Sequence, residues 1–203
     1  MRKIVILCSA LALLTSCIGI DSRMTIRDNG SGTLTLTYRV SQLVTELGVS
    51  STGRSAMPLP LSRADFDRAL AATSGKVRLT SFDRSDNEKD ITIRAQLAFD
   101  SVDALARIDA FRDADLKLAA QGSDRTFSQM VARAPRQPLT DDSKRMLDAL
   151  FDGYDLSFTV EAPRPIKDAT LGTLSPDKRS LTYKTSVKDA LSTPRDLVLS
   201  ASW

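Results

Sequence analysis

Apolar and polar residues alternate along several stretches of the chain, most clearly in Thr33–Val40, Ile91–Phe99 and Tyr154–Glu161. A period of two with one apolar side predicts strands of a sheet that is covered on one face and exposed on the other, an antiparallel habit. Further strands are predicted at Ser22–Arg27, Lys76–Phe82, Asp115–Gln121, Asp168–Leu174, Ser180–Thr185 and the C-terminal Leu197, Leu199, Ala201 and Trp203.

Three segments combine a capping residue with an apolar stripe at helical spacing. Ser62 precedes a helix predicted to reach Thr73, and Asp100 or Ser101 precedes a second one. Thr140 begins a third predicted helix, because two acidic residues follow it in the first turn. Gly153 follows the last turn and is expected to end this helix. The pattern at 41–47 is also compatible with a short helix.

Turn residues separate these elements. Residues 28–32, Asp-Asn-Gly-Ser-Gly, are typical of a hairpin turn, as is Ser-Pro-Asp-Lys at 175–178. Residues 84–88 are expected to join a third pair of strands. Runs of strands interrupted by single helices predict an α+β fold: one twisted antiparallel sheet with two to three helices packed on its apolar face.

The N-terminus has the organisation of a lipoprotein signal peptide. Arg2 and Lys3 precede an apolar run, 4–14. This run is shorter than the stretch of about 20 residues that a helix needs to cross a bilayer. The run ends in Leu-Thr-Ser-Cys at 14–17, a bacterial lipobox pattern. We expect cleavage between Ser16 and Cys17, so that 1–16 is the signal peptide, 17–21 an acylated tether and 22–203 a single α+β domain.

Acylated Cys17 would anchor the protein to a membrane in the cell envelope, outside the cytoplasm; which membrane is left open. Without Arg2 and Lys3 the mature chain has 26 basic and 25 acidic residues, so no nucleic-acid partner is expected. The chain of 203 residues contains no histidine, which excludes triads and metal sites that need an imidazole.

Three short motifs match those of penicillin-binding proteins. Ser175-Pro-Asp-Lys178 fits S-x-x-K, Ser85-Asp-Asn fits S-D-N, and Lys184-Thr-Ser resembles K-T-G. Their order along the chain is wrong, and Ser175 is expected in a turn where that chemistry needs a helix. A small serine or carboxylate hydrolase is therefore the remote alternative, and no catalytic residue is assigned.

Two acidic clusters fall in predicted loops, Asp83–Asp90 and Asp109–Asp115. A calcium loop needs a glycine for its bend, and basic residues interrupt both clusters. We expect solvated surface at both, with no metal and no cofactor.

An apolar ligand pocket between the sheet and its helices is the remaining candidate site. The inward-facing positions that would line it are Leu34, Leu36, Ile93, Leu97, Leu156 and Phe158. The alternative is a closed core at these positions, which would make the chain a structural or surface-interaction lipoprotein with a protein partner not yet identified.

The order of features resembles the LppM-like domain of bacterial lipoproteins. The resemblance rests on the lipobox cysteine, the Asp28–Gly32 turn, the strand Ile91–Phe99 followed by Asp100–Leu105, and the strand Tyr154–Glu161 running into Ala162-Pro163. It implies a membrane-anchored extracytoplasmic α+β domain without catalytic residues that binds a lipid or glycolipid. Cys17 is the one functional residue that it carries over.

Overall fold

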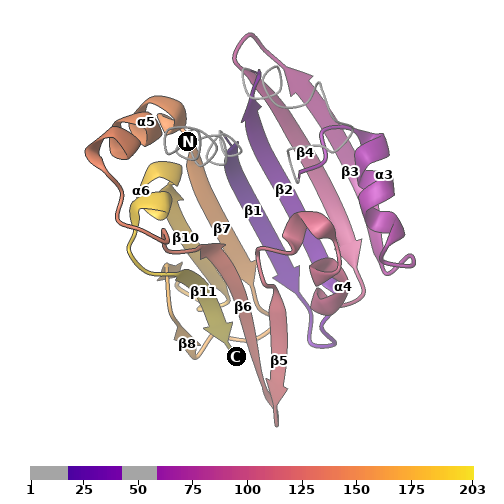
Figure 1. Cartoon of the computed structure of the whole chain (residues 1–203). Helices are drawn as coiled ribbons and strands as arrows, with labels where there is room; N and C mark the ends of the chain where they lie inside the picture. Colours follow the sequence, from indigo (N-terminus) through magenta and orange to yellow (C-terminus); the bar gives the residue numbers. More distant parts are fainter. Residues whose placement is uncertain (1–17, 43–58) are drawn as a thin grey trace.

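The computed structural model describes residues 18–42 and 59–203. Within these ranges the chain forms two β-sheets with helices against them (Figure 1), which confirms the α+β class. The predicted lipobox with Cys17, and most of the short helix predicted at 41–47, lie outside the described residues. Inside them, no helix combines the length and the apolar character that a membrane crossing requires.

The larger sheet has the strand order β3-β4-β2-β1-β7-β10-β9. Its strands are β1 (Ile18–Ile26), β2 (Gly32–Ser41), β3 (Val77–Asp86), β4 (Asp90–Phe99), β7 (Asp155–Glu161), β9 (Thr173–Leu174) and β10 (Ser180–Ser186). The expected all-antiparallel sheet is wrong at one pair, because β1 and β7 run parallel in the middle of the sheet.

A second sheet, which the sequence pattern did not predict, has the order β5-β6-β11-β8. Its strands are β5 (Lys117–Gln121), β6 (Asp124–Ala132), β8 (Asp168–Ala169) and β11 (Leu197–Ser202). The expectation of one sheet is therefore wrong. The single strand predicted at Asp168–Leu174 is in fact two short strands, β8 and β9, that belong to different sheets.

The described helices are α3 (Arg63–Ala71), α4 (Val102–Ala106), α5 (Asp141–Phe151) and α6 (Val187–Ser192), with a 3-10 turn at Asp109–Phe111. Ser62, Ser101 and Thr140 cap the first three as predicted, each accepting a hydrogen bond from the backbone N–H three residues on. The α4 helix is shorter than expected, and α6, capped by Ser186, was not predicted.

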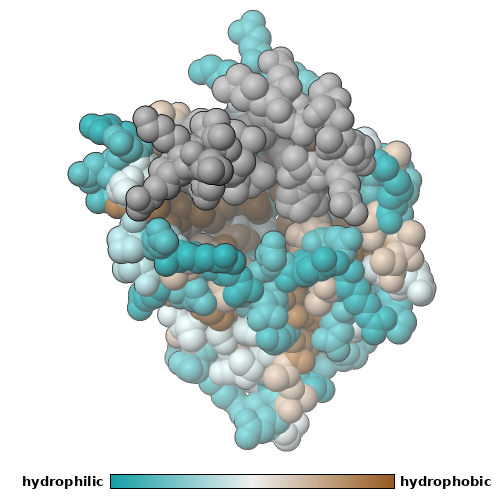
Figure 2. Space-filling model, viewed as in Figure 1, coloured by the Kyte–Doolittle hydropathy of each residue, from teal (hydrophilic) through white to brown (hydrophobic). Residues whose placement is uncertain are grey.

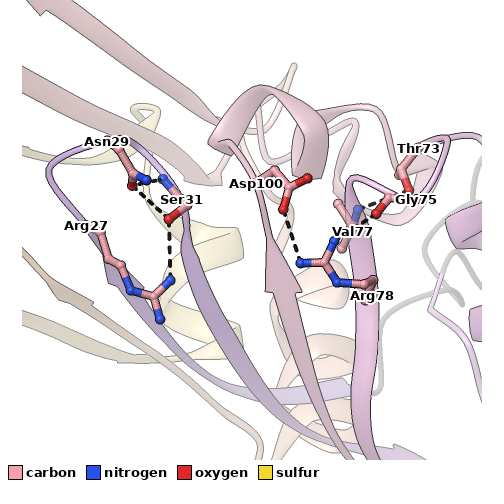
Figure 3. Close-up of polar contacts among 8 residues, drawn as sticks. All are labelled: Arg27, Asn29, Ser31, Thr73, Gly75, Val77, Arg78 and Asp100. Atoms are coloured by element: carbon pink, nitrogen blue, oxygen red, sulfur yellow. Dashed lines mark hydrogen bonds and ion pairs between the residues drawn. The ribbon is translucent and has the colours of Figure 1, made fainter.

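Side-chain hydrogen bonds fix the turns at one end of the large sheet (Figure 3). Asn29 Oδ1 accepts from the backbone N of Ser31 at 3.1 Å and from its hydroxyl at 2.8 Å, while Gly30 takes a positive φ of 80°. Nearby, Arg78 donates to the Gly75 carbonyl and to the Asp100 carboxylate. The predicted turn at 28–32 is thus confirmed as the β1–β2 connection.

The core lies between the two layers. In Figure 1 the small sheet and α4 cover one face of the large sheet, while α3 lies along its β3 edge. Alternate residues of β2 and β4 point into this core, and Val40 and Ile93 have no exposed surface. The period-two pattern of the sequence therefore identified the covered face correctly.

The first strand begins earlier than predicted. β1 pairs with β2 from Ile18 onward, with Ile18 opposite Val40 and Gly19 opposite Arg39. Residues 18–21, which we expected in the tether, are therefore part of the sheet.

Candidate functional site

A cavity of about 190 Å³ lies between the two layers, and we call it the inner cavity. Its walls come from β1, β2 and β7 of the large sheet, from β6 of the small sheet, and from segments at residues 59 and 110–114. The lining residues are Ile20, Ser22, Leu36, Tyr38, Leu59, Ala110, Phe111, Asp113, Ala114, Gln129, Met130, Val131 and Phe158. Figure 2 shows apolar side chains gathered in a hollow of this face, with a band of hydrophilic side chains below it.

The floor of the inner cavity is a row across three neighbouring strands. Ser22 on β1 stands opposite Leu36 on β2 and opposite Phe158 on β7. Residues in register on adjacent strands point to the same face, so the three side chains form one continuous surface. Gln129 and Val131 on β6 contribute the opposite wall.

Two segments close the sides of the cavity. The 110–114 segment is joined to β6 by a hydrogen bond of 2.7 Å from the Met130 backbone N–H to the Ala114 carbonyl. The segment that leads into α3 is held on the other side, where the Tyr38 hydroxyl donates to the carbonyl of Pro60. A backbone hydrogen bond therefore positions the first wall and a side-chain hydrogen bond the second, while the space between them stays open.

Tyr38 and Asp65 form the polar support of the second wall. Burial, and then the negative charge of Asp65, raise the pKa of Tyr38 above its usual value, so its hydroxyl stays protonated and can donate. Partial burial by itself would raise the pKa of Asp65. Hydrogen bonds from Ser62, from Arg68 and from the backbone of Leu61 hold that pKa below its usual value.

The six residues predicted to line a pocket all lie in the core, but they divide among different environments. Leu36 and Phe158 line the inner cavity. Leu97, again with Leu36, borders a gap of about 10 Å³, which has room for one water molecule at most and so counts as packed core. Leu34 and Ile93 are closed in the core, at 2% and 0% exposure. Leu156 borders a hollow on the opposite face.

That second hollow, of about 600 Å³, lies on the outer face of the large sheet, and we call it the outer hollow. It carries charges of both signs, with Arg39, Arg94 and Lys184 against Asp21 and Asp155. The Arg39 guanidinium donates to the Gly153 carbonyl at 2.8 Å and lies 5.4 Å from the ring centroid of Tyr154. Its polar and mixed character suits a wet contact surface better than an apolar ligand.

The hydrolase motifs do not converge. Ser175 precedes the turn between β9 and β10, while Ser85 is in β3, and these strands form opposite edges of the seven-stranded sheet. The Ser175 hydroxyl bonds Asp177 and accepts from the Ser180 backbone, as a turn residue does. The serine form of the remote hydrolase alternative therefore loses the motifs on which it rested.

The acidic clusters are engaged in surface pairs. Asp83 pairs with Arg94, Asp86 with Arg84, Asp109 with Arg112 and Asp115 with Lys117. The Tyr154 hydroxyl donates to Asp90 at 2.6 Å. Among the residues for which the structure gives positions, no group of three or more acidic or cysteine side chains is arranged to hold a metal ion.

The fold and the inner cavity define a two-layer α+β domain with an internal apolar pocket. Comparison with known proteins finds no family model and no curated protein sequence that matches the chain. Among solved structures, it is similar to the NMR structure of the folded domain of LppM from Mycobacterium tuberculosis. The TM-score is 0.49 at 15% sequence identity, over 93% of this chain and 90% of that one. The resemblance predicted from the sequence is thus found, as a distant one, and we transfer no residue role from it.

Proposed function

We propose that this chain is a bacterial lipoprotein, anchored outside the cytoplasm through acyl chains on Cys17, whose domain binds a lipid-like ligand in the inner cavity and catalyses no reaction. The observation that carries the proposal is the cavity itself. Protein interiors are packed with few voids larger than a water molecule, yet about 190 Å³ stays open between these two layers. An engineered apolar cavity of about 150 Å³ takes up benzene, so a space of this size admits part of an acyl chain.

The position of the cavity relative to the anchor supports lipid handling. The cavity residues Ile20 and Ser22 both lie in β1, and they follow Cys17 by three and five positions in the sequence. At about 3.3 Å per residue, they lie within roughly 10 and 17 Å of the acylated residue. A ligand that leaves the bilayer near the anchor would have a short path to the cavity.

The anchor is tested by substitution of its acceptor. Cys17→Ala should abolish metabolic labelling of the protein with a fatty acid and should leave the precursor uncleaved, because the thiol is the acylation site. A Cys8→Ala variant, which alters the other cysteine of the chain, should label normally. Retained label in Cys17→Ala would refute the anchor.

The cavity is tested by filling it. Residues 18–203 contain every described strand and helix. Incubated with a lipid extract of the bacterial envelope, this domain should carry a discrete lipid adduct in native mass spectrometry. Ala114→Leu, which places extra carbons against the cavity, should lose the adduct, whereas Ala119→Leu on exposed β5 should keep it. Equal adducts in both variants would place the ligand elsewhere.

The outer hollow favours a second candidate function. Gly19, which borders it, is two residues from Cys17, so the polar face around Arg39 and Lys184 would be presented close to the membrane. A structural or surface-interaction lipoprotein would use that face for a protein partner. A bare protein mass in every envelope extract would contradict the cavity proposal and favour this alternative.

A further inference from the structure

Two polar side chains are buried against the otherwise mostly apolar inner cavity. Ser22 on β1 and Gln129 on β6 are each 7% exposed, and both line the cavity. Neither side chain makes a hydrogen bond or ion pair with any residue in 18–42 or 59–203. Other buried polar residues differ: Thr73 donates to the Leu70 carbonyl, and Thr159 bonds Thr182.

The polar atoms of both side chains reach the open space of the cavity, since the fully buried, unpartnered side-chain atoms among the described residues are Arg164 Nε and Trp203 Nε1. A hydroxyl and an amide placed in this way can form hydrogen bonds with whatever occupies the cavity. The neighbours of Ser22 in register, Leu36 and Phe158, show that apolar side chains fit this floor. The two polar groups can therefore recognise a ligand whose own polar group replaces the water of the cavity.

The charges around the cavity limit the class of that ligand. The described lining contains no lysine and no arginine, and its one charged residue is the exposed carboxylate of Asp113. Among the described lining residues, a phosphate or a free fatty acid would find no cation and would meet Asp113. A neutral ester or hydroxyl can both accept from the Gln129 amide and exchange a hydrogen bond with Ser22.

We infer that the inner cavity binds a neutral single-chain amphiphile of the monoacylglycerol class, with its acyl segment on Leu36 and Phe158 and its ester or hydroxyl group between Ser22 and Gln129. This assignment rests on the proposed function, and it adds the polarity and the charge of the ligand. It also assigns a specificity role to two residues that apolar patterning does not detect.

The test uses the full chain, reconstituted in phosphatidylcholine vesicles, and two photoactivatable probes of equal chain length. One is a diazirine-bearing monoacylglycerol and the other a diazirine-bearing fatty acid. Mass spectrometry of the tryptic peptides 108–112 and 126–133, which contain cavity residues, reports labelling inside the cavity. The monoacylglycerol should label these peptides several-fold more strongly than the ionised fatty acid at equal membrane concentration.

Gln129→Leu should lower labelling by the monoacylglycerol about fivefold, the change expected for one hydrogen bond, and should leave fatty-acid labelling unchanged. Gln96→Leu, on the exposed face of β4, is the matched control and should label as the wild type does. A thermal melt of each variant establishes that it is folded. Equal labelling by both probes, unaffected by Gln129→Leu, would overturn this inference and leave the proposed function standing. No labelling of the cavity peptides by either probe would refute both.

Discussion

The amide of Gln129, which makes no hydrogen bond to a described residue, predicts that a single substitution makes the protein more stable. In the ligand-free protein, an amide held in a mostly apolar wall with only partial access to water costs roughly 0.5–2 kcal/mol. Leucine has a similar size, needs no hydrogen bond and faces the side chains of an apolar wall. Gln129→Leu should therefore raise the free energy of unfolding by about 1–2 kcal/mol.

The assay is thermal unfolding of ligand-free protein. For a domain of this size, 1 kcal/mol shifts Tm by about 2–4 °C, so Gln129→Leu should melt roughly 3–6 °C above the wild type. Gln96→Leu, the exposed control, should stay within about 2 °C, because surface substitutions change stability by about 0.5 kcal/mol or less. A Tm for Gln129→Leu that falls below the wild type would show that the amide is well satisfied in the folded protein, and would refute the reasoning.

Two further predictions concern the frame around the cavity. Gly32→Ala should destabilise the fold by about 2–3 kcal/mol in a urea titration, because its Cβ would overlap the Thr25 carbonyl oxygen and lie 2.5 Å from the Phe99 ring. The control is Gly19→Ala, whose Cβ would have its nearest contact at 3.4 Å and whose stability should stay near that of the wild type. Equal urea midpoints for the two variants would contradict this packing. The pKa of Asp65 in the folded protein is lower than its ordinary value of 3.8, so the carboxylate stabilises the fold at pH values above 3.8, and this stabilisation is lost as the pH falls through the lower folded-state pKa. Asp65→Asn should therefore lose less stability than the wild type in acid melts below that pH. Parallel acid profiles of the two proteins would refute the assignment.

The sequence allowed the strongly alternating strands to be predicted almost to the residue. Thr33–Val40 and Ile91–Phe99 are each found as strands, β2 and β4, with one extra residue at one or both ends. Capping chemistry located the starts of three helices equally well. These features are local, so the residues that cause them stand next to one another along the chain.

The strand β6 and the polar wall of the cavity escaped prediction for the same physical reason. The inward positions of β6 are occupied by Phe127, Gln129 and Val131, and the glutamine interrupts the apolar alternation that would have indicated a strand. Without β6, the second sheet could not be predicted. The residue that hid the strand is also the one that gives the cavity its polar wall.

Long-range pairing was the other feature that could not be predicted. The parallel pair of β1 with β7 joins residues far apart in the sequence, such as Thr25 and Glu161, which are 136 positions apart, and no local pattern specifies such a partner. The position of the second layer decides which inward-facing leucines border the cavity and which are packed in the core. Leu36 and Phe158 border the cavity because β6 and the 110–114 segment stand away from them, while Leu34 is packed in the closed core.

The most direct test of the account is a crystal structure of the protein grown with monoolein, a single-chain neutral amphiphile. The account predicts an acyl chain in the inner cavity, over Leu36 and Phe158, and a ligand oxygen about 2.7–3.2 Å from the amide nitrogen of Gln129. A cavity closed by its own side chains, with the Gln129 amide bonded to another residue of the protein, would contradict it.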